Sequence, residues 1–224
     1  MARIVRLLFH ILSTTSIALL STSVVHSEPV PITVYYESLC SDTIKFFLQK
    51  LIPTYGQTNY DFANLLSNME LVPYGKVKVI DAELYQYSCQ HGPSECLGNK
   101  LNGCAVKYIT DKKKLLNYIG CLMWKSIRII SSEEEFPVEE CQDKIPEDLF
   151  LKIAHCYNTN EGWHQFNHNG HLSNEAYGNS IVFIPLITFN NVTDGTVSNS
   201  AYRNFRRTLC SQNGIEHAAC SDEA

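Results

Sequence analysis

The sequence predicts an α/β fold, and three observations support that class. An alternating apolar segment at residues 31–36 is typical of a β-strand, and a helical pattern follows it directly after Cys40. Residues 69–80 contain a second strand pattern, with a Pro-Tyr-Gly break at residues 73–75. Residues 181–189 carry the strongest strand pattern of the chain. Together these segments predict a β-α-β opening and a later strand.

The first strand and the first helix follow from two different apolar periods. Apolar side chains alternate along residues 31–36, which is the period of a strand. After Cys40, apolar residues recur at helical spacing, namely Ile44, Phe47, Leu48 and Leu51. We expect Pro53 to end this helix, because proline lacks the N–H that a helix interior needs.

The region from Cys89 to Cys156 interrupts this pattern and is rich in helical signals. It holds six of the nine cysteines. Apolar residues at helical spacing predict three helices, at residues 105–109, 115–123 and 149–154. The last is entered at Pro146, since proline is favoured at the start of a helix. A polar segment rich in His and Asn follows, and we expect it on the surface.

The last part of the chain holds the later strand, a turn and a helix. Pro185 lies inside the strand pattern, where proline normally argues against a central strand. Residues 190–195 contain an Asp-Gly pair that predicts a hairpin turn. Apolar residues at helical spacing over residues 199–210 predict the final helix.

The N-terminus indicates a secreted protein, and the charge distribution bears on the class of partner. Residues 1–27 are typical of a signal peptide, with Arg3 and Arg6 before an apolar run. An uncleaved anchor is the alternative, but His10 and several hydroxyl residues interrupt the run. Removing the two signal arginines from 18 basic residues leaves 16 against 23 acidic residues, a net charge of −7. No basic patch stands out, which argues against a nucleic-acid partner.

The remaining residues, 28–224, are expected to form one domain without a transmembrane span. A signal peptide without a retention motif makes secretion the default, with the lysosome as the alternative. Asn191 begins the sequon Asn-Val-Thr, which predicts N-glycosylation in a secreted chain. The alternative for this tripeptide is an unmodified turn.

Nine cysteines, all after residue 27, fit an oxidising compartment. Because nine is odd, we expect four disulfides and one free thiol, and Cys40 is the expected free thiol. The sequence leaves the pairing open for the other eight, which are Cys89, Cys96, Cys104, Cys121, Cys141, Cys156, Cys210 and Cys220.

One motif resembles the signature of a known family. Residues 89–104 read CQHGxxECxxNxxxxC, which is similar to the signature of the gamma-interferon-inducible lysosomal thiol reductase (GILT) family. The β-α-β opening, with Cys40 at the first strand-to-helix junction, resembles the thioredoxin fold. The resemblance covers nearly all of residues 28–224, from Ile32 to Cys220.

The resemblance implies a thioredoxin-like fold with a helical, disulfide-stapled insertion at roughly residues 89–156. It also implies a cis-proline at Pro185 that faces Cys40, although an edge-strand proline is the alternative. The family uses a Cys-x-x-Cys pair to reduce disulfides, and the resemblance implies no cofactor and no metal.

This chain departs from the family at the second cysteine, because Thr43 stands there in Cys40-Ser41-Asp42-Thr43. Cys40, at a helix N-terminus, meets the need for a nucleophilic thiolate. Thr43 cannot resolve a mixed disulfide, although its hydroxyl can donate a hydrogen bond to the thiolate. Asp42 either disfavours the thiolate through its charge or acts only as a helix-start residue.

Two functions follow, and a third is weaker. The favoured one is a secreted binding protein with weak or no turnover, whose partner is a protein or lies on a cell surface. The alternative is a monothiol reductase that acts on disulfide-containing proteins with Cys40 and an external thiol such as glutathione or cysteine. The third is a covalent dimer or adduct through Cys40.

Histidines offer two further candidates. His91 within the signature is expected to make a turn, and titration near the site is the alternative. His164, His168 and His171 have offsets that place them on one helical face, a possible zinc arrangement. Asn167 and the Asn-Gly pair at residues 169–170 disfavour a helix there, so we expect a polar surface segment without metal.

Overall fold

A computed structural model describes residues 29–57, 62–130, 135–178, 183–212 and 220. The predicted signal peptide at residues 1–27 lies outside this part of the chain. So do the first two residues of the predicted strand at 181–189. All nine cysteines lie within it.

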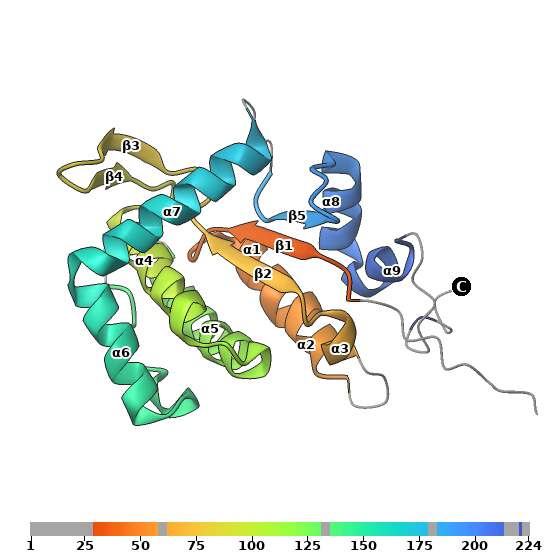
Figure 1. Ribbon diagram of the computed structural model, residues 1–224, viewed down its shortest axis with the longest axis horizontal. Coiled ribbons are helices and arrows are strands. Elements are labelled where there is room, and N and C mark those ends of the chain that lie inside the picture. Colours follow the sequence, from red (N-terminus) through yellow and green to blue (C-terminus); the bar gives the residue numbers. More distant parts are fainter. Residues whose placement is uncertain (1–28, 58–61, 131–134, 179–182, 213–219, 221–224) are drawn as a thin grey trace, which may run out of the picture.

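A three-stranded sheet forms the centre of the molecule (Figure 1). Strand β1 (Ile32–Tyr36) lies between its parallel partner β2 (Met69–Pro73) and its antiparallel partner β5 (Leu186–Phe189). The parallel pairing of β1 and β2 through a helix confirms the predicted β-α-β opening. The second half of the predicted strand at 69–80 leaves this sheet. It becomes β3 (Lys78–Asp81), which pairs only with β4 (Gln86–Ser88).

The helix after Cys40 does not end at Pro53, contrary to the prediction. It continues through α1 (Ser41–Phe46), the π-helical turn η1 (Phe47–Leu51) and α2 (Ile52–Tyr55). The Ile52 N–H donates to the Phe47 carbonyl, five residues back. Pro53 therefore stands at the start of a new α-helical segment, where its missing N–H leaves no interior bond unmade.

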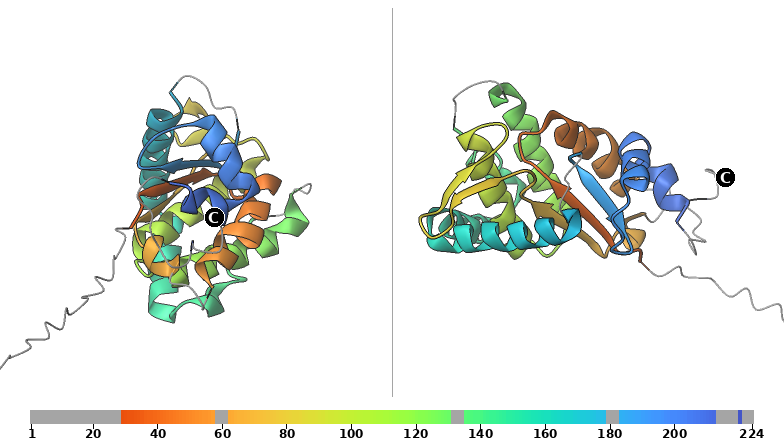
Figure 2. Two further views of the ribbon diagram at one scale, coloured as in Figure 1. Left: turned by 90° about the vertical axis from the view of Figure 1, so that its right-hand side faces the viewer. Right: turned by 90° about the horizontal axis from the view of Figure 1, so that it is seen from above.

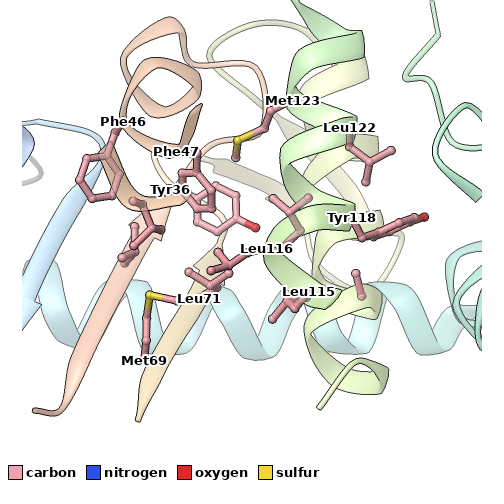
Figure 3. Packing of buried hydrophobic residues seen from close by; sticks show 14 of the residues in the cluster. Tyr36, Phe46, Phe47, Met69, Leu71, Leu115, Leu116, Tyr118, Leu122 and Met123 are labelled. Atoms are coloured by element: carbon pink, nitrogen blue, oxygen red, sulfur yellow. The ribbon is translucent and has the colours of Figure 1, made fainter. Parts of the chain in front are cut away.

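One face of the sheet packs against this helix and α5 (Lys112–Ser126), as Figure 3 shows. Tyr36 of β1 lies against Phe47, with ring centroids 4.9 Å apart, and both side chains are fully buried. Burial of one such aromatic side chain contributes about 1.5–3 kcal/mol to folding. The main core therefore fixes the position of the helix that Cys40 begins.

Four helices follow the β3–β4 hairpin along the chain, and the last of them crosses the sheet face opposite α1 and α5 (Figure 2). They are α4 (Pro93–Tyr108), α5, α6 (Glu147–Asn158) and α7 (Asn160–Tyr177). The described residues before β5 also form three short helical segments, which are α3 (Phe62–Leu65), η2 (Ile127–Ile129) and η3 (Gln142–Lys144). Helices α4, α5 and α6 contain the three predicted helical runs, and Pro146 caps α6 as expected.

The segment rich in His and Asn forms α7, an 18-residue helix that the sequence did not predict. Close packing explains it. A Cβ on Gly170 would lie 2.8 Å from the Tyr74 ring, so the helix approaches β2 where only glycine fits. The buried Asn169 amide donates to the Pro73 carbonyl at 3.4 Å. These contacts outweigh the low helix propensity of both residues.

Four disulfides staple the chain, and Cys40 is the cysteine left free. The pairs are Cys89–Cys96, Cys104–Cys156, Cys121–Cys141 and Cys210–Cys220. The second pair joins α4 to α6. The third joins α5 to the residue before η3.

The C-terminal region differs from the prediction in its turn and its helix. The tight turn after β5 uses Asn190 and Asn191, which have φ of 53° and 59°. The Asp-Gly pair makes no hairpin; Asp194 instead caps α8 (Gly195–Arg203). The predicted single helix is divided at Asn204, which caps α9 (Phe205–Cys210).

The element order and the sheet order confirm the predicted thioredoxin-like α/β fold. The helices that begin at α1 cover one face of β1. On the other face, Tyr35 packs edge-on against Tyr177 of α7, with centroids 5.6 Å apart. None of the helices in the described residues is long and apolar enough to span a membrane.

Candidate active site around Cys40

Cys40 is the residue that caps α1, directly after β1 and a short loop. Its side chain is only 9% exposed and packs with Tyr177 and Leu186. The Cys40 Sγ lies 3.7 Å from the Ile184 carbonyl oxygen. The peptide bond between Ile184 and Pro185 is cis. The site thus brings Cys40 and Pro185 together from opposite ends of the sequence.

Burial has the largest effect on the pKa of the Cys40 thiol and raises it. The backbone N–H and the hydroxyl of Thr43 and the Asp42 N–H act in the opposite direction. The negative charge of Glu37 adds to the increase. The groups at the helix N-terminus therefore lower the pKa of Cys40 by less than burial raises it.

Thr43 lies one turn after Cys40 and is fully buried. Its hydroxyl makes no hydrogen bond of normal geometry with the described residues, yet it lies near enough to Cys40 to favour the thiolate. The other eight cysteines are all in disulfides, so none supplies a second free thiol. The site holds one nucleophilic sulfur.

The Asp42 carboxylate is held by a hydrogen bond from α8. The Tyr202 hydroxyl of α8 donates to Asp42 Oδ1 at 2.6 Å. Burial and this hydrogen bond raise the pKa of Tyr202 to about 12, so the phenol stays protonated as a donor. The carboxylate that disfavours the Cys40 thiolate is Glu37, which the sequence did not single out.

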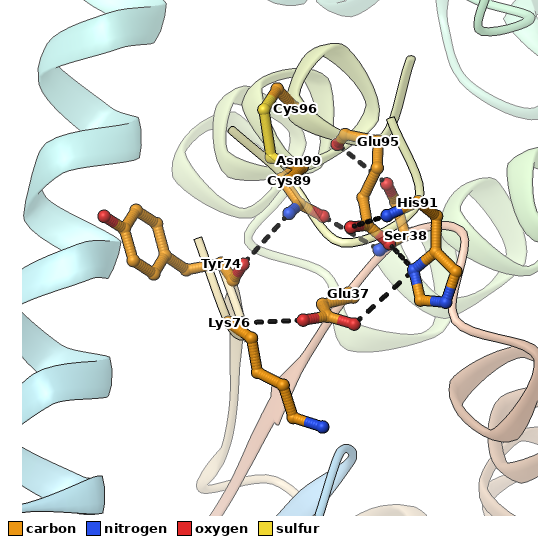
Figure 4. Close-up of a disulfide and its surroundings, with 9 residues drawn as sticks. All are labelled: Glu37, Ser38, Tyr74, Lys76, Cys89, His91, Glu95, Cys96 and Asn99. Atoms are coloured by element: carbon orange, nitrogen blue, oxygen red, sulfur yellow. Dashed lines mark hydrogen bonds and ion pairs between the residues drawn. A yellow bond between two sulfur atoms is a disulfide. The ribbon is translucent and has the colours of Figure 1, made fainter. Parts of the chain in front are cut away.

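The signature residues hold the loop that precedes Cys40 (Figure 4). The Asn99 amide joins the segments that follow β1 and β2: its Oδ1 accepts from the Ser38 N–H at 2.8 Å, and its Nδ2 donates to the Tyr74 carbonyl at 3.1 Å. The Ser38 hydroxyl donates to the Glu95 carbonyl at 3.1 Å. The Cys89–Cys96 disulfide closes the turn at the start of α4. The motif is therefore scaffolding for the β1–α1 loop.

His91 lies in a cluster with two buried glutamates. Its Nδ1 is 2.5 Å from Glu95 Oε2 and 3.7 Å from Glu37 Oε2. Burial and the charge of Glu95 raise the pKa of Glu37 to about 7, against the effects of the Lys76 N–H and His91. The hydrogen bond to Glu95 raises the pKa of His91. Glu95 stood within the signature, but no sequence pattern connected Glu37 with it.

The remaining candidates lie on the surface. His164, His168 and His171 are exposed on α7, and among the described residues no candidate metal group includes them. His164 Nε2 lies 3.2 Å from the Tyr85 hydroxyl. Asn191 is exposed in the turn after β5, where its side chain is open to solvent.

Comparison with known proteins agrees with the site. The family model of gamma interferon inducible lysosomal thiol reductase matches residues 31–145, which include Cys40 and the whole signature. A gamma-interferon-inducible lysosomal thiol reductase-like protein of Anopheles gambiae is 30% identical over 205 residues, 86% of this chain and 80% of the relative.

Two further relatives match over similar lengths. GILT-like protein 1 of Drosophila melanogaster is 29% identical, with 81% of this chain and 74% of the relative covered. The gamma-interferon-inducible lysosomal thiol reductase of Carassius auratus is 27% identical, with 87% and 73% covered. With the matched signature, the thioredoxin-like fold and the placement of Cys40, the chain belongs to the gamma-interferon-inducible lysosomal thiol reductase family.

Proposed function

We propose that this protein is a secreted GILT-family glycoprotein that has weak or no reductase turnover and acts by binding a partner. The observation that carries the proposal is the buried Thr43 beside a single buried thiol. The partner is a protein, free or on a cell surface. Secretion rests on the signal-peptide pattern, with the lysosome as the alternative, and glycosylation rests on the Asn191 sequon.

Reduction of a disulfide by a two-cysteine site takes two exchanges. In the first, a thiolate attacks one substrate sulfur and the other sulfur leaves as a thiolate. In the second, the resolving thiolate attacks the enzyme sulfur of the mixed disulfide and releases the reduced substrate. Thr43 has no sulfur for the second exchange, so a mixed disulfide on Cys40 persists unless another thiol removes it.

The first exchange is also weakened. Burial and the nearby Glu37 carboxylate raise the pKa of Cys40, so little thiolate is present to attack. The Cys40 side chain is 9% exposed, which limits the approach of a folded substrate. Both effects favour binding over turnover.

A monothiol reductase is the second candidate, and the free Cys40 beside Pro185 favours it. In this mechanism a disulfide-containing protein forms a mixed disulfide with Cys40 and loses one thiolate. A glutathione thiolate then attacks Cys40 Sγ or the substrate sulfur. A second glutathione completes the reduction, so two glutathiones become one glutathione disulfide for each substrate disulfide reduced.

Reductase assays on a denatured disulfide protein, with glutathione supplied, distinguish the two. We expect no turnover by the natural protein, and turnover after Thr43→Cys, which restores the resolving thiol. Cys40→Ser is the matched control and should be inactive in both backgrounds. Turnover by the natural protein that disappears in Cys40→Ser would instead establish the monothiol reductase.

The same samples test covalent association through Cys40. On a non-reducing gel, we expect the natural protein to run as a monomer. A dimer or adduct band that disappears in Cys40→Ser would show that Cys40 acts as an intermolecular link and not as a spare thiol.

A further inference from the structure

Two buried carboxylates and a partly exposed imidazole converge beside the loop that precedes Cys40. Glu37, Glu95 and His91 each offer one ligand atom, and these atoms all lie within 4.8 Å of one another. Figure 4 shows the three side chains directed at one another. Glu37 comes from the end of β1, His91 from the turn after β4, and Glu95 from the first turn of α4. Three separate segments therefore contribute one donor atom each.

The second oxygen of each carboxylate is already held by the backbone. Glu37 Oε1 accepts from the Lys76 N–H at 2.6 Å, and Glu95 Oε1 accepts from the His91 N–H at 3.0 Å. These bonds fix both carboxylates, so that their Oε2 atoms are directed at the same imidazole nitrogen. Such support of ligand atoms is typical of built metal sites.

Glu37 Oε2 is a buried oxygen that accepts no hydrogen bond from the described residues. The Glu37 side chain is 1% exposed. Its Oε2 forms an ion pair with His91 Nδ1 at 3.7 Å, and this separation is too long for a hydrogen bond. A buried carboxylate oxygen without a donor is a position where a cation is favourable.

We propose that Glu37, Glu95 and His91 bind one divalent transition-metal ion, with zinc as the best-fitting ion. One imidazole nitrogen and two carboxylate oxygens are ligand types that zinc takes, and three protein ligands leave a fourth position for water. Calcium requires six to eight oxygen ligands, which this cluster does not offer. His91 is 23% exposed, so the ion enters from its side.

The geometry needs a small adjustment at one ligand. Zinc–ligand bonds of about 2.0–2.2 Å in a tetrahedron place the ligand atoms about 3.4 Å apart. The separation of 3.7 Å between His91 Nδ1 and Glu37 Oε2 is already close to this value. The separation of 2.5 Å between His91 Nδ1 and Glu95 Oε2 must open, and rotation of the partly exposed imidazole achieves this.

Calorimetric titration of the mature protein with zinc chloride tests the proposal. We expect one zinc ion per chain, and at least a tenfold loss of affinity in Glu37→Gln. That substitution keeps an oxygen for the Lys76 N–H and removes the ligand charge. The matched control replaces the three exposed histidines of α7, His164, His168 and His171, with Gln and should bind zinc as the natural protein does.

Cobalt(II) spectroscopy of the natural protein keeps the test decisive if Glu37→Gln fails to fold, which circular dichroism would reveal. We expect tetrahedral d–d bands without a sulfur-to-cobalt charge-transfer band, unchanged in Cys40→Ser. The proposal is overturned by absent zinc binding, by a thiolate band, or by binding that disappears only in the α7 variant. It does not rest on the proposed function, because metal binding is independent of whether the protein turns over.

Discussion

Slow alkylation of Cys40 is expected, because burial raises the pKa of its thiol. Cys40 is the free thiol of the chain, since the other eight cysteines form disulfides. Incorporation of iodoacetamide under non-reducing conditions therefore reports on Cys40 alone. Only the thiolate reacts, so the rate follows the ionised fraction.

The expected magnitude follows from the direction of the pKa shift. A cysteine with an ordinary pKa of about 8.5 is about 3% ionised at about pH 7. Burial raises the pKa of Cys40 above its ordinary value, so its ionised fraction is smaller still. With a pKa that high, each unit of pH from about 6 to 8 increases the thiolate, and hence the rate, about tenfold.

Mass spectrometry of quenched time points measures the rate, with Cys40→Ser as the blank. Thr43→Val should slow the reaction, because the Thr43 hydroxyl lowers the pKa of Cys40, and Thr43→Ser should not. A rate that levels off, with a rise of less than about threefold between about pH 7 and pH 8, would show that the pKa of Cys40 is not raised. That result would give Cys40 a low pKa of the kind found in reactive cysteines.

Further predictions concern stability, measured by urea unfolding monitored with circular dichroism. Replacing both Cys104 and Cys156 with Ala opens a loop of 52 residues and should lower the free energy of unfolding by about 4 kcal/mol. Replacing Cys210 and Cys220, whose loop spans 10 residues, should lower it by only about 3 kcal/mol. Equal losses would mean that loop length does not set the contribution of these disulfides. Gly75→Ala should lower the free energy of unfolding more than Gly92→Ala does. Both glycines have a positive φ, of 66° and 87°, but a Cβ on Gly75 would also collide with the Glu37 side chain, whereas a Cβ on Gly92 would meet open space. Asn99→Ala leaves two buried backbone groups unpaired and should cost about 2–4 kcal/mol; a loss below 1 kcal/mol would mean that water replaces the amide.

Local patterns predicted much of the fold. The alternating residues of β1 and the apolar spacing of α4, α5 and α6 are periodic patterns that a short window of sequence contains, although the structure buries β1 and α4 on more than one face. Helix α7 escaped prediction because its glycines and asparagines are poor helix formers that gain their stability from contacts with β2 and Tyr74. Such contacts join segments far apart in sequence, so no local window contains them.

The same limit applies to the site. Cys40, Thr43 and Pro185 could be identified from the sequence, since a motif or a family resemblance marks each position. Glu37 could not, because a single glutamate at the end of a strand has no pattern of its own. Its significance comes from burial and from His91 and Glu95, which the fold brings to it from distant parts of the chain.

Asn99 and its neighbours have a structural role that is independent of the chemistry of residue 43. These signature residues support the backbone ahead of Cys40 through hydrogen bonds and a disulfide, and their work is the same whether residue 43 carries a sulfur or a hydroxyl. The eight specified residues of the signature thus support the backbone ahead of Cys40, and they carry no information on the side chain at residue 43.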